Sequence, residues 1–300
     1  MPPLLRLTSA PKAFMRPILD VTSLLTFGDA WLIDAFGVLV DHSGARPGAA
    51  AFVEAITERG DPWMVLTNDA ARSPAQAAAW YRSLGLAIDD ERVLTSGAMV
   101  ATTLHQQGLA SADVLALGPD DSLAMLRDAG VHLVDTSSTF DVLVVCDEMG
   151  FPFHDTVNHI MSELILAAKR GALPPCFVAN PDVIYPTGGG RFAMAAGAVA
   201  RLFEEAVNVH HDVGRFFVPL GKPAAPIFKE AMRRLGHAHP VMLGDTLHTD
   251  IRGAQQAGLR AVLVGDHPLL HLARQDADPK QKAPELCPDA FLPEFFADDR

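Results

Sequence analysis

The sequence predicts an α/β protein built around a parallel sheet, and two observations lead to this prediction. First, short apolar runs recur along the chain, and polar or glycine residues follow each of them at once. These runs are Ala30–Ile33, Trp63–Leu66, Phe216–Leu220, Val241–Leu243 and Ala261–Val264. Second, stretches rich in Ala, Leu, Arg and Glu separate most of the runs. Strands that alternate with helices are typical of a parallel sheet, which binds ligands at the carboxyl ends of its strands.

The middle of the chain repeats this alternation and is predicted to be a separate domain. Further strands are expected at Val114–Leu117, Val142–Cys146 and Cys176–Ala179, and helices at Asp121–Ala129 and Val157–Arg170. The simplest arrangement is an α/β cap domain, residues 92–208, inserted into a Rossmann-like core domain formed by residues 1–91 and 209–300.

Composition narrows the class of protein. Of the 300 residues, 49% are hydrophobic and 20% are charged, which is typical of a globular protein rather than a disordered one. The formal net charge of -12 is opposite to the balance of a protein that grips nucleic acid by its phosphates. We therefore expect no nucleic-acid partner, and an anionic substrate would need cations placed locally.

The cysteines and the apolar runs indicate the cellular compartment of the protein. Cys146, Cys176 and Cys287 are far apart, and no CxxC pair is present, so neither a disulfide framework nor a zinc site is expected. The N-terminal residues include basic side chains but no continuous apolar segment of a secretory signal. No apolar run reaches the length of a membrane span. The sequence therefore predicts a cytoplasmic protein with reduced thiols and no membrane partner.

Reactive side chains follow the predicted strands. Asp34 follows the first, Thr67 the second and Lys222 the third, while Asp245 and Asp250 follow the fourth. Carboxylates from separate strands suit Mg²⁺, and a carboxylate held beside a metal and a lysine can attack phosphorus. Each motif alone is more often a helix cap or a turn. Their order and their place after four strands are what indicate a site.

The same order of motifs resembles a known family. The motifs are Asp34-Ala-Phe-Gly-Val-Leu39, Leu66-Thr-Asn68, Gly221-Lys-Pro223 and Gly244-Asp-Thr-Leu-His-Thr-Asp-Ile251. They are similar to the four motifs of the haloacid dehalogenase (HAD) superfamily. Thr67–Ser73 and Ala179–Asp182, the latter followed by Tyr185-Pro186, resemble the class IIA branch of NagD and p-nitrophenylphosphatase. That branch carries a large α/β cap between its second and third motifs.

The resemblance implies a role for each matching residue. Asp34 would be the nucleophile and a metal ligand, and Lys222 would steady the nucleophile and the phosphate. Mg²⁺ would also be bound by Asp245 and by the backbone carbonyl of Phe36, with Asp250 supporting the metal site from the first or second shell. The residues expected to bind the substrate are Thr67, Asn68, Asp69, Arg72, Asn180 and Asp182. The class IIA resemblance also suggests a homodimer formed through the cap.

Phe36 departs from the family pattern. Most HAD phosphatases carry a second Asp two residues after the nucleophile, which protonates the leaving oxygen and then activates water. Phe36 cannot do this, and Asp-Ala-Phe-Gly looks like the Asp-Ala-Tyr-Gly of 2-haloacid dehalogenases. Those enzymes need no Mg²⁺, however, and usually carry a helical cap. Three hypotheses therefore stand: a Mg²⁺-dependent phosphatase acting on a small phosphorylated metabolite, a 2-haloacid dehalogenase or other carbon-centred hydrolase, and a non-catalytic binding protein.

Other residues carry weaker signals. Asp41 and His42 could supply a substitute acid or simply lie in a solvated loop. His248 lies within the fourth motif and could face the site or the surface. The run Gly188–Gly190 lacks the Lys-Ser/Thr of a phosphate-binding P-loop and is interpreted as a cap loop. Core packing explains Trp63.

Overall fold

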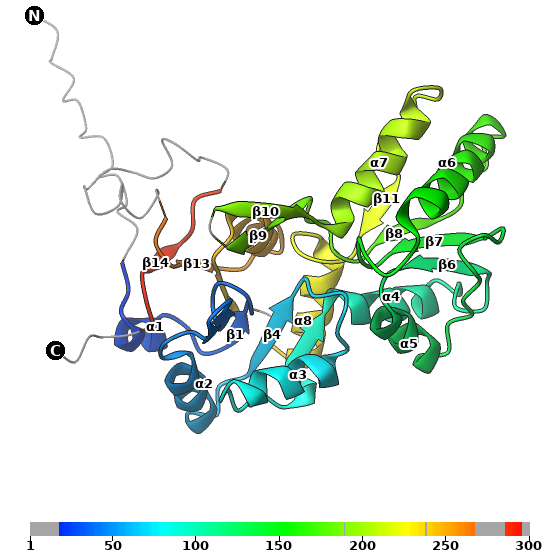
Figure 1. Ribbon diagram of the computed structural model, residues 1–300. Helices are drawn as coiled ribbons and strands as arrows, with labels where there is room; N and C mark the ends of the chain where they lie inside the picture. Colours follow the sequence, from blue (N-terminus) through cyan, green and yellow to red (C-terminus); the bar gives the residue numbers. More distant parts are fainter. Residues whose placement is uncertain (1–17, 189, 238, 268–285, 296–300) are drawn as a thin grey trace, which may run out of the picture.

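The chain folds into two α/β parts, each built around a parallel sheet. A computed structural model describes residues 18–188, 190–237, 239–267 and 286–295. Figure 1 shows a larger sheet on the left and a smaller one on the right, with helices around both. The predicted fold class is confirmed. The predictions about the N-terminal segment and about Gly189 lie outside the described residues.

The larger sheet has six parallel strands in the order β14-β13-β12-β1-β4-β5. Their bounds are β1 Trp31–Ile33, β4 Trp63–Thr67, β5 Val93–Thr95, β12 Val241–Gly244, β13 Ala261–Val264 and β14 Ala290–Leu292. From β1 the chain builds outward through β4 to β5, and later it builds in the other direction from β12 to β14. The strand order therefore reverses between β1 and β12, which is where such sheets open a ligand crevice.

Alternate residues of the core strands pack on opposite faces of the sheet. Trp31 and Ile33 pack with residues of helices α2 (Ala49–Glu58) and α3 (Pro74–Ser83). Leu32 packs on the other face, with residues of α4 (Ser96–Gln106) and α8 (Ala225–Leu235). Trp63 is buried in the first of these clusters, as the core-packing interpretation requires.

The smaller sheet has four parallel strands in the order β11-β8-β7-β6. The strands are β6 Val114–Leu117, β7 Val142–Val145, β8 Cys176–Val178 and β11 Phe217–Pro219. Residues of α6 (Phe153–Lys169) and α7 (Ala196–Asn208) pack on one face. The other face packs with α4 and α5 (Asp120–Asp128) in a cluster that continues into the core. We call this smaller part the cap.

Two strands next to the predicted domain boundaries belong to the other sheet. The assignment of Phe216–Leu220 to the core sheet is wrong, because β11 pairs with β8, with Phe217 beside Cys176. Conversely, β5 pairs with β4 in the core sheet, although it lies within residues 92–208. A three-residue apolar run does not reveal which sheet will accept it. The domain division stays a prediction. These pairings favour a chain that passes from the core to the cap after β5 and back to the core after β11.

Two small hairpins complete the walls of the crevice. The first joins β2 (Val40–Asp41) to β3 (Gly44–Ala45), directly after the first motif. The second joins β9 (Ile184–Gly188) to β10 (Arg191–Met194) and extends from the cap toward the core (Figure 1). The remaining helical elements are α1 Val21–Phe27, a 3₁₀ turn at Asp90–Arg92, a π-helical turn at Leu247–Ile251 and α9 Arg252–Gln256. Among the described residues, none of these helices combines the length and the apolarity that crossing a membrane requires.

Candidate active site

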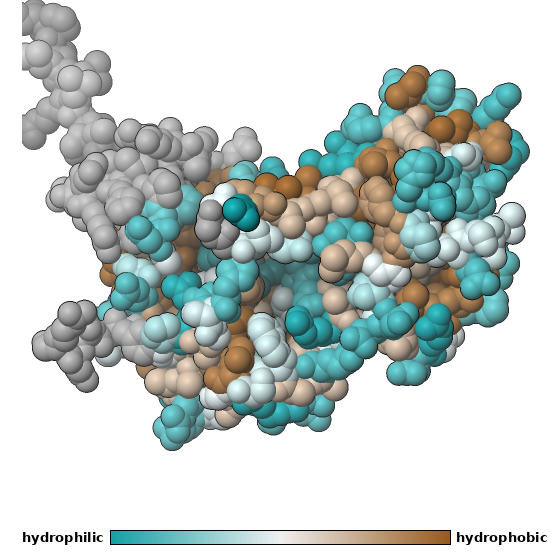
Figure 2. All heavy atoms as spheres, viewed as in Figure 1, coloured by the Kyte–Doolittle hydropathy of each residue, from teal (hydrophilic) through white to brown (hydrophobic). Residues whose placement is uncertain are grey.

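A cavity of about 620 Å³ lies at the carboxyl ends of the core strands, between the core and the cap. Figure 2 shows the surface hollowed in this region, beneath the apolar residues of the β9–β10 hairpin. Residues from both parts line the cavity. They are Asp34, Ala35, Phe36, Val40, Asp41, His42, Thr67, Asn68, Asp69, Arg72, Trp80, Tyr81, Asn180, Asp182, Ile184, Tyr185, Lys222, Asp245, Thr246 and Thr249.

Asp34 is held at the end of β1 by its neighbours. Its N–H donates to the carbonyl of Leu243 at 2.9 Å, and its Oδ1 accepts from the N–H of Ala35 at 2.7 Å. The side chain is only 13% exposed. Burial raises the pKa of Asp34 well above its usual value, and the negative charge of Asp250 adds to this, whereas Lys222 opposes it. The ionised form therefore depends on its cationic partner.

Lys222 supplies that partner. Its Nζ lies 2.6 Å from Oδ1 of Asp34 and 2.7 Å from Oδ1 of Asp250, and its side chain is 2% exposed. Burial by itself lowers the pKa of Lys222, but the charges of Asp250 and Asp34 outweigh burial and raise it. The ammonium group is therefore a fixed positive charge between two carboxylates.

Asn68 fixes the backbone that carries this lysine. Its Oδ1 accepts from the N–H of Lys222 at 2.7 Å, and its Nδ2 donates to the Lys222 carbonyl at 2.9 Å. The same Nδ2 donates to Oδ2 of Asp182 at 3.1 Å. A Cβ on Gly221 would lie 2.6 Å from Oδ1 of Asn68, so a residue with a side chain there would push the two segments apart.

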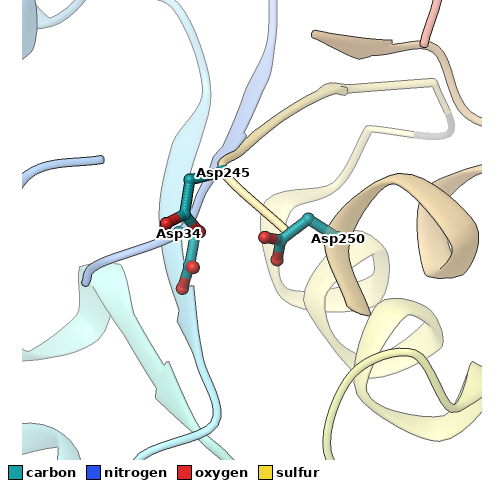
Figure 3. A group of neighbouring side chains, drawn as sticks. All are labelled: Asp34, Asp245 and Asp250. Carbon is teal, nitrogen blue, oxygen red and sulfur yellow. The ribbon is translucent and has the colours of Figure 1, made fainter. Parts of the chain in front are cut away.

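Three carboxylates converge beside Lys222. Asp34, Asp245 and Asp250 each offer an oxygen within 4.8 Å of the others, and Figure 3 shows the three groups turned toward one another. The π-helical turn Leu247–Ile251 brings Asp250 back behind Asp245, and such turns are frequent at functional sites. Burial, and then the charge of Asp250, raise the pKa of Asp245 to about 6.

Both oxygens of Asp250 face protein groups, although Oδ1 forms an ion pair without a hydrogen bond. Oδ1 lies against Lys222 at 2.7 Å, and Oδ2 accepts from the N–H of Thr246 at 3.1 Å. Asp245 accepts from the Thr246 hydroxyl through Oδ1 at 3.0 Å. Oδ2 of Asp245 lies close to the backbone of Gly37, which has a φ of 88°. A Cβ on Gly37 would lie 1.9 Å from this oxygen. A glycine is therefore required where the loop after Asp34 passes Asp245.

The comparisons with known proteins agree with this geometry. Residues 31–132 match the family model of haloacid dehalogenase-like hydrolases, and residues 219–288 match a model of HAD-hydrolase-like proteins. Dihydroxyacetone phosphatase of Corynebacterium glutamicum is 31% identical over 242 residues, which is 80% of this chain and 82% of that protein. The chain belongs to the haloacid dehalogenase-like hydrolase family.

Further relatives place the chain in the NagD-like branch that the motifs indicated. The ribonucleotide monophosphatase NagD of Escherichia coli K12 is 30% identical over 237 residues, covering 78% of this chain and 86% of NagD. A solved structure from Cytophaga hutchinsonii, described as a possible sugar phosphatase, is 28% identical with a TM-score of 0.76. That comparison covers 94% of this chain and 99% of the other. The chain is thus a HAD-type hydrolase.

The residues expected from HAD motifs to bind the substrate all line the cavity. They are Thr67, Asn68, Asp69, Arg72, Asn180 and Asp182. Arg72 is held by Asp69 at 2.9 Å, and its guanidinium lies 4.8 Å from the centre of the Trp80 ring. Asn180 accepts from the N–H of Asp182 at 3.0 Å. The structure therefore brings both cap residues to the same cavity as the core motifs.

The three residues with weaker sequence signals differ in their position relative to the cavity. Asp41 and His42 line the cavity, whereas His248 is exposed and is not among the described residues that line it. Oδ1 of Asp41 accepts from the hydroxyl of Ser43 at 2.5 Å and from its N–H at 2.7 Å, and these hydrogen bonds lower the pKa of Asp41. Asp41 is thus an ionised carboxylate, which is a poor proton donor.

Several residues that line the cavity carry no signal of a site in the sequence. Trp80 and Tyr81 come from α3, and Ile184 and Thr249 from the cap hairpin and the π-helical turn. Aromatic and apolar residues in a helix or strand pattern look like core residues, and Tyr81 is indeed buried. Only the capping box at Ser73 and Gln76, which begins α3 directly after the second motif, marks this helix as adjacent to the site.

Proposed function

We propose that the chain is a Mg²⁺-dependent phosphatase that hydrolyses a small phosphorylated metabolite through an aspartyl-phosphate on Asp34. The observation that carries the proposal is the buried ion pair of 2.6 Å between Lys222 and Asp34, next to a cluster of carboxylates. The names of the relatives, dihydroxyacetone phosphatase and ribonucleotide monophosphatase, support a phosphate ester of a small metabolite as substrate.

The donor set fits a hard divalent cation. Carboxylate and carbonyl oxygens are the ligands that Mg²⁺ prefers. Because Asp250 is fully buried, with one oxygen paired to Lys222 and the other bound by the N–H of Thr246, Asp34 and Asp245 are better placed to bind the ion directly. We propose the backbone carbonyl of Phe36 as a third protein ligand, with Asp250 holding Lys222 and Thr246 in place. When bound, the ion would neutralise charge on the phosphoryl oxygens.

The chain's own residues account for the phosphoryl transfer. A carboxylate oxygen of Asp34 forms a bond to phosphorus while the ester P–O bond breaks, and the electron pair stays on the leaving oxygen. Lys222 keeps Asp34 ionised and faces the charge of the transferred group. The hydroxyl of Thr67 and the N–H groups of the loop after β4 would hold phosphoryl oxygens. Water then attacks the aspartyl-phosphate, releasing phosphate and restoring Asp34.

The remaining cavity residues divide into positioning and binding roles. The amide of Asn68 is already engaged with Lys222 and Asp182, so we propose that Asn68 positions the lysine rather than grasping the phosphate through its side chain. Among the described residues that line the cavity, two carry a Lys or Arg side chain, and these are Lys222 and Arg72. We propose that Arg72, with Asp69, Asn180 and Asp182, contacts the part of the substrate beyond the phosphate.

Phosphate release decides between this function and its alternatives. The screen measures inorganic phosphate from a panel of metabolite phosphates, with and without Mg²⁺, and free halide from 2-haloacids in parallel. Mg²⁺-dependent phosphate release that is lost in Asp34→Asn supports the proposal. Phe36 favours the dehalogenase alternative, so halide release without phosphate release would establish that activity instead. Release of neither product would leave a binding protein as the remaining hypothesis.

We also propose a homodimer formed through the cap, in the cytoplasm. Phe192 and Met194 of β10 are exposed apolar residues on the cap hairpin, which supports a contact surface there. The well-separated, buried cysteines suit a reducing compartment. Sedimentation at micromolar concentration tests the assembly, and a single species of 32.1 kDa would contradict it.

A further inference from the structure

Phe36 exposes an aromatic ring next to the reactive carboxylate. Its ring lines the cavity and is 39% exposed, whereas Asp34 is only 13% exposed. The ring contacts His42 edge to face, with 4.8 Å between ring centres. Phe36 therefore does not fill the protein interior. It forms part of the wall that a substrate must pass.

The cap presents apolar side chains to the same cavity. Ile184 and Tyr185 of β9 line it and are 56% and 38% exposed. The polar groups that would act on phosphate lie deeper, since Thr67 and Lys222 are 6% and 2% exposed. The cavity thus has a charged floor, and Phe36, Ile184 and Tyr185 add apolar surface from the core and the cap beside polar side chains such as Arg72 and His42. A group attached to a phosphate held at the floor would contact this apolar surface.

The chemistry of Phe36 restricts that group independently. A general acid contributes about 10²–10⁴-fold by protonating the leaving oxygen, and phenylalanine cannot do so. Asp41 is ionised, so unless His42 donates a proton the leaving oxygen departs as an anion and takes its proton from solvent afterwards. Hydroxyls that tolerate this are weakly basic ones, such as phenols and enols. Such groups are planar and unsaturated, which is the shape that aromatic walls contact well.

We propose that Phe36 is a specificity-determining residue whose ring packs on the leaving group, with Ile184 and Tyr185 on the cap side. The substrate class is then a phosphate monoester of a planar, weakly basic hydroxyl, that is, an aryl or enol phosphate. This inference rests on the proposed phosphatase function. It assigns a binding role to the residue that replaces the family's acid.

Phe36→Leu tests the effect of the aromatic ring by itself. Leucine is apolar and not aromatic, and like phenylalanine it cannot act as an acid. We expect the KM for p-nitrophenyl phosphate to rise about five- to tenfold with kcat little changed, while both constants for glycerol phosphate stay the same. Tyr185→Leu should act in the same direction, and Tyr185→Phe, which keeps the ring, should not. Phe153→Leu is the matched control, since Phe153 of α6 is as exposed as Phe36, at 39%, and does not line the cavity.

A binding measurement covers the case in which turnover is slow. Phenylphosphonate and methylphosphonate share a phosphoryl group but cannot lose a leaving oxygen. Calorimetry with Mg²⁺ should show phenylphosphonate binding more tightly to the wild type, and Phe36→Leu should reduce this preference about five- to tenfold. Circular dichroism checks that each variant is folded.

The outcomes separate this inference from the function on which it rests. If aryl and alkyl phosphates are hydrolysed equally well, or if Phe36→Leu changes neither the KM nor the phenylphosphonate preference, the inference is wrong and the phosphatase function stands. If no ester releases phosphate, the proposed function itself is wrong, and the substrate class falls with it.

Discussion

Lys222 and Asp34 form an ion pair of 2.6 Å between the end of the cap sheet and the first strand of the core. Lys222 comes shortly after β11, the last cap strand, and α8 then returns the chain to the core. The proposed nucleophile is thus paired with its lysine only when the chain has left the cap. We therefore expect hydrolysis to depend on the correct docking of the two parts.

Lys222→Met tests this pairing. The substitution leaves Asp34 and Asp250 close together without a cation, and because Lys222 lowers the pKa of Asp34, its loss raises that pKa further. We expect kcat/KM to fall about 10³-fold, with the acid limb of its pH profile moved to higher pH. Lys229→Met, an exposed change on α8, is the control and should leave the profile unchanged. An acid limb at the same pH in Lys222→Met would show that Lys222 does not set the ionisation of Asp34.

Asp34→Asn should abolish hydrolysis, because an amide is a poor nucleophile and a weaker metal ligand. Trapping the protein with labelled phosphate donor and acid quench should detect an acyl-phosphate in the wild type and none in the variant. Asp41→Asn makes the same chemical change at a cavity carboxylate whose pKa Ser43 lowers, and it should keep the acyl-phosphate. Wild-type turnover in Asp34→Asn would remove Asp34 as the nucleophile.

Much of the fold was predictable because buried parallel strands carry a strong apolar signal. β1, β4, β12 and β13 are found where their apolar runs predicted them. β11 was placed in the wrong sheet, since the partner of a three-residue strand depends on long-range pairing rather than on its own sequence. The capping interactions and the turn at Leu247–Ile251 likewise depend on contacts that no local pattern specifies.

The floor of the site was more predictable than its walls. Asp34, Lys222 and Asp245 were identified because reactive residues at strand ends have few structural explanations when they recur in order. The structure changes the view of Asn68, whose amide is bound to Lys222 and Asp182. Trp80 carries no sequence signal of a site, because an aromatic residue in a helix has core packing as its default interpretation.

Asp245→Asn should raise the Mg²⁺ concentration needed for half-maximal activity at least tenfold, because one of the few charged ligands is lost. Metal titrations of phosphate release measure this directly. Asp182→Asn is a useful comparison, since Asp182 lines the cavity but lies outside the carboxylate cluster. It should alter substrate KM without the same effect on the metal. Superimposable metal titrations of Asp245→Asn and wild type would exclude Asp245 as a ligand.

The metal requirement should also depend on pH. The pKa of Asp245 is raised to about 6 by burial and by Asp250, and the protonated acid is a poor ligand. As the pH falls below about 6, protons compete with Mg²⁺, so the half-saturating Mg²⁺ concentration should rise about tenfold per pH unit. Above that pH it should level off. Calorimetric titration at several pH values, in the absence of substrate, separates this effect from the ionisation of substrate, and a flat dependence between pH 5 and 7 would contradict it.

Glu204 provides a test of the cap that is independent of catalysis. This buried side chain of α7 accepts from the N–H groups of Phe216 and Phe217, both at 3.0 Å, and pairs with Arg215 at 2.5 Å. It therefore ties α7 to the start of β11, the strand that leads to Lys222. Glu204→Gln replaces one accepting oxygen with a donor and removes the charge. We expect it to lower the free energy of unfolding by about 1.5–3 kcal/mol, measured by urea denaturation.

Glu205→Gln is the matched control for this change. Glu205 is the neighbouring residue and also pairs with Arg215, but at 3.6 Å and with a side chain that is 73% exposed, against 4% for Glu204. An exposed ion pair contributes at most about 1 kcal/mol, so this variant should unfold close to the wild type. If α7 and β11 also hold Lys222 in place, Glu204→Gln should reduce kcat at temperatures where the protein is still folded. Equal urea midpoints for the two variants would show that the buried carboxylate does not stabilise the cap.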